Sequence, residues 1–179
     1  LGIGRTFQNI RLWHDMTVLD NIRMAQHGNA GYSMVDIFTK SSKYQIREEE
    51  ITEKALELLK IFGLQDQAEE FPKNLPYGVQ RRIEIARALA LNPKLLLLDE
   101  PAAGLSSADI VDLIDHIRWV HENFDVAIWM IEHQMQVVMT LCERITVIDF
   151  GKPIAEGTPD EIKNDKRVIE AYLGEETQI

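Results

Sequence analysis

The alternation of apolar and polar positions along the chain predicts helices in its first part and buried strands later. The clearest helix spans residues 48–62, because its apolar residues fall on one face and Gly63 suits its C-terminal end. An earlier amphipathic pattern, residues 16–27, predicts a helix that is capped by Thr17 or Asp15.

The segment between these two helices is rich in glycine, serine and polar residues. Residues 28–43 therefore predict a loop, with a short helical turn near residues 35–38. The acidic residues 48–50 are expected at the start of the following helix, where they suit the positive end of its dipole. Together, residues 15–74 predict an all-helical subdomain that is inserted in an α/β frame.

A loop, a helix, a turn and a strand follow in residues 75–101. The helix is expected to open at a turn around Gly78 and to end before Asn92-Pro93, because proline cannot continue a helix. Its expected inner face is apolar and consists of Ile85, Ala86, Leu89 and Ala90. Residues 95–98 are four leucines, a run typical of a parallel strand that is covered on both faces.

The rest of the chain continues this alternation, which predicts a mostly parallel sheet. The expected elements are a small-residue loop at 102–107, a serine-capped helix at 108–122, a buried strand at 126–131, a helix at 134–142, a strand at 145–148, a β-hairpin through Gly151-Lys152 into residues 153–156, a helix capped by Thr158, and a helix at 166–173. Two apolar stripes are expected to face the core, namely Ile110, Val111, Ile114 and Ile117, and Met135, Val138, Met139 and Leu141.

Composition and charge narrow the possible functions. The chain has 179 residues, of which 45% are hydrophobic, enough for one sizeable core. Its formal net charge of −10 argues against general nucleic-acid binding, which needs a basic surface. A single cysteine, Cys142, excludes an internal disulfide and indicates a reducing compartment. The sequence holds no run of about 18 apolar residues, so we expect any membrane role to go through a partner.

Two carboxylates follow the leucine strand, at the edge where open α/β sheets bind ligands. Asp99 suits Mg²⁺, which prefers a few carboxylates together with phosphate oxygens. Glu100 is suited to polarise a water for attack on a terminal phosphate. His133 ends the neighbouring predicted strand and is suited to bond the same phosphate. The helix that opens at Gly78 has free amides and a positive dipole end, which suit an anion.

Each of these residues also has a structural interpretation. Residues 99–101 suit a helix-capping turn, a lone histidine is usually structural, and Gln8 by itself is an ordinary loop glutamine. Residues 4–6 imitate the end of a phosphate-binding loop but lack its lysine, and the pattern G-x-x-x-x-G-K-[ST] occurs nowhere in the chain. Because the chain begins at Leu1 rather than at methionine, we expect an amino-terminal truncation.

Taken in order, these motifs resemble those of the ATP-binding subunits of ABC transporters. Gln8, in Arg5-Thr6-Phe7-Gln8, resembles the Q-loop glutamine, which in that family senses Mg²⁺ and links to the helical subdomain. Residues 95–99 resemble the Walker B strand, with Glu100 as the catalytic base, and His133 resembles the switch histidine. The signature and D-loop positions supply the remaining implied nucleotide contacts, which are Leu75, Pro76, Tyr77, Gly78, Val79, Gln80 and Ser106.

The resemblance implies an α/β fold of the P-loop NTPase (RecA-like) type, with an inserted helical subdomain and without its first strands and Walker A loop. The implied parts are a Q-loop end of the core at 1–14, the helical subdomain at 15–74, a core with signature helix, Walker B, D-loop and H-loop at 75–157, and a helical tail at 158–179. ATP and Mg²⁺ are the implied cofactors, with Asp99 and Gln8 as metal ligands.

The resemblance also implies partners and a place in the cell. Two ATPase subunits, identical or different, would bind Mg-ATP head to tail and dock on membrane permease subunits, with a substrate-binding protein as an indirect partner and no nucleic acid. The implied location is the cytoplasmic face of the inner membrane. Without a Walker A loop, the 179 residues alone are expected to be inactive.

The subfamily with the greatest resemblance is that of the high-affinity branched-chain amino acid importers. The similar segments are residues 5–8, 77–78, 101–105 and the tail 171–175. Lipopolysaccharide-export ATPases, urea or amide transporters, a soluble ABC ATPase of translation or repair, and a non-hydrolysing fragment that only docks on a partner are the alternatives. Three residues depart from the family pattern, namely Pro76 for serine and Val79 for glutamine or glutamate in the signature, and Ser106 for aspartate in the D-loop.

Overall fold

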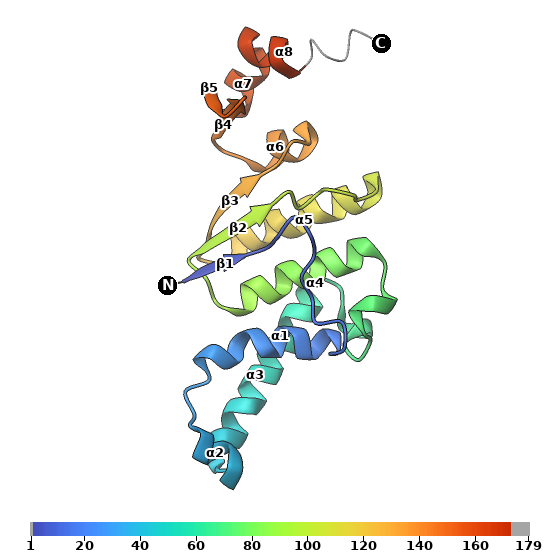
Figure 1. Cartoon of the computed structure of the whole chain (residues 1–179), viewed down its shortest axis with the longest axis vertical. Coiled ribbons are helices and arrows are strands. Elements are labelled where there is room, and N and C mark those ends of the chain that lie inside the picture. Colours follow the sequence, from blue (N-terminus) through green and yellow to red (C-terminus); the bar gives the residue numbers. More distant parts are fainter. Residues whose placement is uncertain (1, 173–179) are drawn as a thin grey trace. The chain divides into compact units, whose positions relative to one another are not determined.

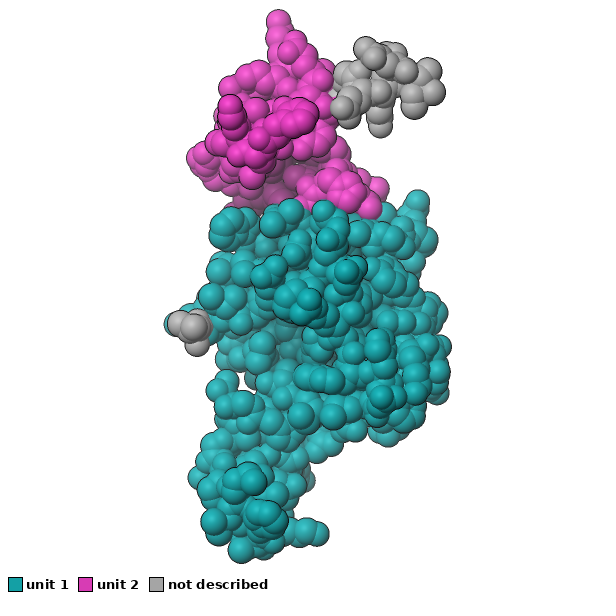
Figure 2. All heavy atoms as spheres, viewed as in Figure 1, with its two compact units in different colours: residues 1–131 teal, residues 132–179 magenta. Residues whose placement is uncertain are grey.

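The computed structural model describes residues 2–172 and divides into two compact units (Figures 1 and 2). The first unit ends at Ile131 and the second begins at Glu132. The first unit holds a parallel sheet and a helical region, and the second holds a β-hairpin and short helices. None of the helices in residues 2–172 combines the length and the apolar character that crossing a membrane requires.

The described part of the first unit contains a three-stranded parallel sheet of β1 (Ile3–Arg5), β2 (Leu95–Asp99) and β3 (Ala127–Ile131) (Figure 1). The strand β2 lies in the middle, and its first residue is opposite Ile3 on one side and Ala127 on the other. Parallel strands with intervening helices confirm the predicted α/β class. The carboxyl ends of β1 and β2 therefore meet at one edge of the sheet.

The prediction that the strand at 126–131 is buried is wrong. No residue of β3 is buried, and Trp129 and Ile131 are 68% and 64% exposed. In β2, by contrast, Leu96 and Leu98 are each only 1% exposed, and the other residues of the strand are half-buried. Successive side chains of a strand point to opposite faces, so an apolar run alone does not tell which of its faces is covered.

The helices of the first unit follow the predicted order. They are α1 (Val18–Gln26), α2 (Met34–Thr39), α3 (Ser42–Ile61), α4 (Tyr77–Ala90) and α5 (Ser107–Asn123), with short 3₁₀ turns η1 (His27–Asn29), η2 (Gln65–Gln67) and η3 (Pro72–Asn74). Thr17 caps α1 by accepting a hydrogen bond from Asp20 N at 3.1 Å, which decides between the two predicted caps. Residues 15–74 consist of these helices and turns together with the loops that connect them.

Helix α3 begins six residues before the predicted start at Glu48, and its cap is Ser41, which accepts from Tyr44 N at 3.3 Å. The expected role of the acidic residues at the helix start is therefore wrong. Glu48 instead ties α3 to its neighbours, because its carboxylate accepts hydrogen bonds from Arg23 at 2.9 Å and from Tyr32 at 2.5 Å. The first residues of α3 are mostly polar, so the apolar periodicity begins only after the helix has started.

The helical region packs through buried apolar side chains. Helix α1 lies against α3 and α4, and the contributing residues of α1 and α3 are Val18, Ile22, Ile51, Ala55, Leu58 and Leu59. Phe62 is fully buried, and its ring stacks on His116 of α5 with the centroids 5.2 Å apart. The carbonyl of Phe62 also accepts a hydrogen bond from Arg82 Nη1 at 3.1 Å. The end of α3 is thus held by both α4 and α5.

The second unit contains α6 (Met135–Leu141), β4 (Ile145–Asp149), β5 (Lys152–Gly157), α7 (Pro159–Asn164) and α8 (Lys166–Tyr172). The strands β4 and β5 form the predicted antiparallel hairpin, whose turn residues Phe150 and Gly151 both have positive φ angles, as tight hairpin turns require. Thr158 and Glu161 form a capping box at the start of α7. The core of the second unit consists of Ile145, Val147, Ala155, Ile162 and Val168.

Both predicted apolar stripes need correction. In α6, Val137 is the buried residue, Val138 and Met139 are partly buried against the core, and Met135 is exposed. In α5, Val111 is exposed, whereas the three isoleucines of its stripe are buried. A helix presents a narrower stripe to its neighbours than the full set of its apolar positions. Leu173, the predicted end of the last helix, lies outside the described residues.

Gly4 in β1 is the position in the sheet where we expect the smallest substitution to have a large effect. A Cβ atom at this position would lie 2.8 Å from the carbonyl oxygen of Ala88 in α4. Because that atom belongs to a helix backbone, Gly4→Ala is expected to lower the free energy of unfolding by about 1–3 kcal/mol. Gly28→Ala is the matched control, since a Cβ at Gly28 meets nothing within 4 Å. Denaturant unfolding of both variants checks this, and an equal stability of the two would contradict it.

Candidate functional site

The first group of predicted site residues lies at the carboxyl edge of the parallel sheet. Asp99 is the last residue of β2, and its carboxylate pairs with Arg5 at the end of β1, Nη2 to Oδ2 at 3.2 Å. The backbone amide of Asp99 donates to the hydroxyl of the buried Thr6 at 3.3 Å. Thr6 itself continues the pairing of the strands, since its amide donates to Leu97 O at 2.9 Å. The end of β1 thus holds Asp99 in place.

Gln8 and Glu100 meet at the same edge. The amide nitrogen Nε2 of Gln8 donates to Oε2 of Glu100 at 2.8 Å. Glu100 has a φ of +43°, which is unusual for a residue with a side chain, and its amide donates to Ile131 O at 2.8 Å. Strained backbone of this kind is frequent at functional sites. The structure therefore brings together the predicted Q-loop glutamine, the predicted metal ligand Asp99 and the predicted catalytic base.

The second group lies at the beginning of α4. The helix starts at Tyr77, one residue before Gly78, and its N-cap is Pro76, which offers no side-chain hydrogen bond. The backbone bond from Gln80 N to Pro76 O, at 3.0 Å, opens the intrahelical ladder. The amides of Tyr77, Gly78 and Val79 precede that ladder and point out of the helix end. The Gln80 side chain donates to Leu75 O at 2.9 Å and closes the turn before the helix.

The predicted D-loop lies against this helix end. A Cβ atom at Gly78 would lie 2.7 Å from Oδ1 of Asp109, so only glycine fits there without a shift. Ser106 caps α5 and donates to Oδ2 of the same Asp109 at 2.6 Å. A Cβ atom at Gly104 would lie 3.4 Å from the ring of Tyr77. The predicted signature and D-loop residues are therefore neighbours within one chain.

A buried ion pair that sequence reasoning missed connects the two groups. Arg81 and Glu84 of α4 are both fully buried, with Nη1 and Oε2 2.8 Å apart. Arg81 donates to the carbonyls of Phe7 and Gln8, at 2.7 and 2.8 Å. The pKa of Glu84 is raised, because burial disfavours its carboxylate more than Arg81 and the nearby amides favour it. The only signal in the sequence is two opposite charges three residues apart, a spacing that exposed helix pairs share.

His133 belongs to the second unit and stands just before α6. The carboxylate of Glu132 accepts hydrogen bonds from the amides of His133 and Gln134, at 2.8 and 3.1 Å. Oε1 of Glu132 also lies 3.4 Å from Nδ1 of His133. Glu132 therefore holds the backbone at the start of α6, a role that the sequence did not suggest. The catalytic role of His133 stays a prediction.

Residues 2–172 contain no group of three or more histidine, cysteine, aspartate and glutamate side chains that could hold a metal ion. The chemistry of the predicted ligands nevertheless fits Mg²⁺, which commonly takes one or two protein oxygens and keeps phosphate oxygens and waters as its other ligands. Asp99 offers a carboxylate that is partly exposed, and the side-chain amide of Gln8 contacts Glu100, the next residue of the chain. These two residues suit a magnesium ion that arrives with a nucleotide.

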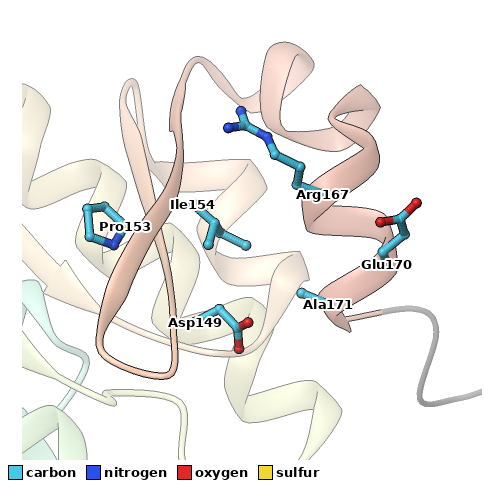
Figure 3. A pocket seen from close by; sticks show the side chains of 6 residues that line it. All are labelled: Asp149, Pro153, Ile154, Arg167, Glu170 and Ala171. Carbon is cyan, nitrogen blue, oxygen red and sulfur yellow. The ribbon is translucent and has the colours of Figure 1, made fainter.

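A hollow of about 550 Å³ lies in the second unit, and none of the predicted site residues lines it. Figure 3 shows its walls, with Pro153 and Ile154 on the hairpin, Asp149 at the end of β4, and Arg167, Glu170 and Ala171 on α8. The guanidinium of Arg167 is already paired with Asp165, with Nη2 and Oδ2 2.7 Å apart. Arg167, the one cationic residue among the six that line the hollow, is thus already held by an acidic neighbour.

Two known protein families match the parts of the chain that form this site and the segment after it. The family described as ABC transporter matches residues 1–103, which include β1, the helical region, α4, and the two carboxylates at the end of β2, Asp99 and Glu100. The chain belongs to the ATP-binding subunits of ABC transporters. The family described as branched-chain amino acid ATP-binding cassette transporter matches residues 152–177 in addition, which include β5 and the helices after it. The predicted resemblance and its subfamily are thereby confirmed.

Known relatives of this ABC ATP-binding chain agree with that assignment. It is 40% identical over 175 residues to the high-affinity branched-chain amino acid transport ATP-binding protein LivG of Salmonella typhimurium, which covers 98% of this chain and 69% of the relative. It is 40% identical to BraF of Pseudomonas aeruginosa, a protein of the same description, over 97% of this chain and 68% of the relative. The solved structure of MJ1267, an ATP-binding cassette of an ABC transporter in its ADP conformation, matches with a TM-score of 0.77 at 30% identity, over 97% of this chain and 68% of that chain.

Proposed function

We propose that this chain provides the Walker B, signature and Q-loop parts of an ATP-hydrolysing subunit that energises the import of branched-chain amino acids. The observation that carries the proposal is the group of Gln8, Asp99 and Glu100 at the carboxyl edge of the parallel sheet, in a chain of the ABC family. Phosphoryl transfer needs positioning and charge compensation at such an edge more than covalent chemistry.

In this proposal, Glu100 is the general base. Its carboxylate orients a water for in-line attack on the γ-phosphate and takes the proton that the water loses. The hydrogen bond from Gln8 to Oε2 of Glu100 orients this carboxylate at the edge of the sheet. His133 is assigned to the transferred phosphate, where a ring N–H would stabilise the developing negative charge.

Mg²⁺ would be held by Asp99 and Gln8 together with phosphate oxygens, and it supplies charge neutralisation when it is bound. Arg5 lies beside Asp99 and holds its carboxylate at the strand end until the metal arrives. The chain contains no Walker A pattern, so we propose that the 179 residues alone do not turn over ATP. A subunit that also carries a G-x-x-x-x-G-K-[ST] loop would hydrolyse it.

The beginning of α4 is assigned to the nucleotide of a second subunit. The amides before the helix ladder and the helix dipole favour a phosphate, and this contact needs no side chain from Pro76. Leu75, Val79, Gln80 and Ser106 shape that surface. Two subunits, identical or different, would then bind ATP head to tail, with the helical region docked on membrane permease subunits at the cytoplasmic face of the membrane.

The import of branched-chain amino acids is proposed from the printed descriptions of LivG and BraF. The test is uptake of labelled leucine by vesicles that contain the subunit with a Walker A loop, its permease subunits and a binding protein. We expect ATP-dependent uptake of leucine. An excess of isoleucine or valine should lower this uptake, and an excess of methionine should leave it unchanged. Uptake of urea or amides, or ATP-driven release of lipopolysaccharide without amino acid uptake, would contradict the proposed substrate.

A further inference from the structure

The ion pair between Arg81 and Glu84 is more completely buried than ordinary helix salt bridges. Both side chains are fully buried on α4, although their spacing of three residues is typical of exposed pairs. Removing two charges from water is costly, and a buried ion pair often stabilises a fold no more than apolar residues of the same size would. A contribution to stability is therefore a weak explanation for this pair, and its contacts outside α4 suggest a better one.

Most of the hydrogen bonds that the pair makes with other residues go to a single segment, residues 7–11. Arg81 donates to the carbonyls on this segment, Nη1 to Phe7 O at 2.7 Å and Nη2 to Gln8 O at 2.8 Å. Oε1 of Glu84 accepts from the amides of Phe7 and Arg11, at 3.4 and 3.2 Å. The backbone is thus held on both sides of Gln8 by groups of opposite charge.

No helix or strand ladder fixes this segment, since residues 6–17 form neither. The side chain of Gln8 leaves the held backbone and reaches Glu100 at 2.8 Å. The same guanidinium also donates from Nη2 to the hydroxyl of Tyr77, at 3.0 Å, in the first turn of α4. One buried group therefore touches the backbone of Gln8 and the first turn of the signature helix.

We propose that the Arg81–Glu84 pair is the positioning device of Gln8, so that the placement of Gln8 depends on α4 as well as on the strand that precedes it. The consequence rests on the function proposed above. Gln8 would serve the nucleotide of its own subunit and the beginning of α4 that of the partner, so the pair would connect the two nucleotide sites within one chain. Neither residue would touch a nucleotide.

Hydrogen exchange of the 179-residue chain tests the positioning directly. Arg81→Met is expected to speed exchange in peptides that cover residues 6–12 by about tenfold or more, while α3 stays protected. Arg81→Lys covers the case in which Arg81→Met does not fold. Lysine keeps the positive charge beside Glu84, but a single ammonium cannot reproduce the fork of the guanidinium, so residues 6–12 are still expected to loosen.

Arg82→Lys is the matched control, because Arg82 is the next residue of the helix and donates to Phe62 rather than to residues 7–11. It should leave exchange of residues 6–12 unchanged. If Arg81→Lys speeds exchange in residues 6–12 no more than in α3, the pair only stabilises the fold and the proposal is overturned. The same conclusion follows if Arg82→Lys loosens residues 6–12 equally.

The link to nucleotide chemistry is tested in a subunit that also carries a Walker A loop. Gln8→Ala and Arg81→Lys should both raise the Mg²⁺ concentration needed for half-maximal turnover, and Arg82→Lys should not. If Gln8→Ala shifts this concentration and Arg81→Lys does not, the positioning proposal is overturned. If Gln8→Ala itself has no effect, the role proposed for Gln8 fails, and the exchange experiment still decides whether the pair positions it.

Discussion

Replacement of Glu100 by glutamine is expected to lower ATP turnover by about 10²–10⁴-fold in a subunit that also carries a Walker A loop. Glutamine has the size of glutamate and can still accept the hydrogen bond that Gln8 donates at 2.8 Å. Its amide cannot take a proton from the attacking water, so only the chemical step is lost. Steady-state phosphate release and equilibrium ATP binding, measured on the same preparation, are expected to show lost turnover with unchanged affinity.

Two controls accompany this measurement. Glu122→Gln makes the same chemical change at an exposed position near the end of α5 and should leave turnover unchanged. The 179-residue chain without a Walker A loop should give no turnover above background. Turnover by Glu100→Gln close to that of the unsubstituted subunit would show that another group is the base.

Gly78→Asp is the second substitution for which we expect a large effect, a loss of turnover of about 10²-fold or more. The new carboxylate would stand in the first turn of α4, where the free amides are proposed to hold the partner's phosphate, and it would repel that phosphate. A Cβ at this position also crowds Asp109 at 2.7 Å. The Asp109 side chain can move away, but the two like charges lower stability, so turnover is measured at a temperature at which the variant is folded.

The matched control for this substitution is Gly28→Asp, since Gly28 lies in open space outside the proposed site. Turnover and thermal unfolding are measured for both variants. Gly78→Asp should lose turnover at temperatures below its unfolding transition, and Gly28→Asp should change neither turnover nor melting temperature. If Gly78→Asp keeps normal turnover, the beginning of α4 does not bind phosphate.

The order of elements around β2 was predictable from sequence because its signals are local. The proline after α4, the leucine run and the small residues before α5 each fix one boundary through backbone geometry. The start of α3 was missed because the helix begins with polar residues that Ser41 caps and Glu48 ties down by contacts with α1 and the following loop. Tertiary contacts of this kind leave no periodic pattern.

The candidate site shows the same division between local and distant signals. Gln8, Asp99 and Glu100 could be named from their motifs, and the contact between Gln8 and Glu100 spans 92 positions of sequence, which no spacing rule predicts. Arg81 and Glu84 could not be assigned, because their burial depends on a segment more than 70 positions earlier in the chain. The exposure of the β3 side chains was not predicted, because an apolar run does not tell which face of the sheet is covered by a neighbouring element.

Glu100 and Gly78 of one chain are proposed to serve two different nucleotides. Mixing Glu100→Gln subunits with Gly78→Asp subunits, each with a Walker A loop, tests it. Head-to-tail sites give every mixed dimer one intact site and one doubly substituted site. In an equal mixture, about one quarter of all nucleotide sites should therefore be intact, and turnover should be about one quarter of that of unsubstituted dimers. The second mixture combines unsubstituted subunits with subunits that carry both changes. Its mixed dimers have no intact site, so only the dimers of two unsubstituted subunits turn over ATP, and about one quarter of all sites should again be intact.

If both residues served the same nucleotide, the two mixtures would differ. The mixture of single variants would then show no turnover, and the mixture with the double variant would keep about one half of the intact sites. We predict equal recovery of about one quarter in both mixtures. No recovery in the first mixture together with one half in the second would contradict the head-to-tail arrangement.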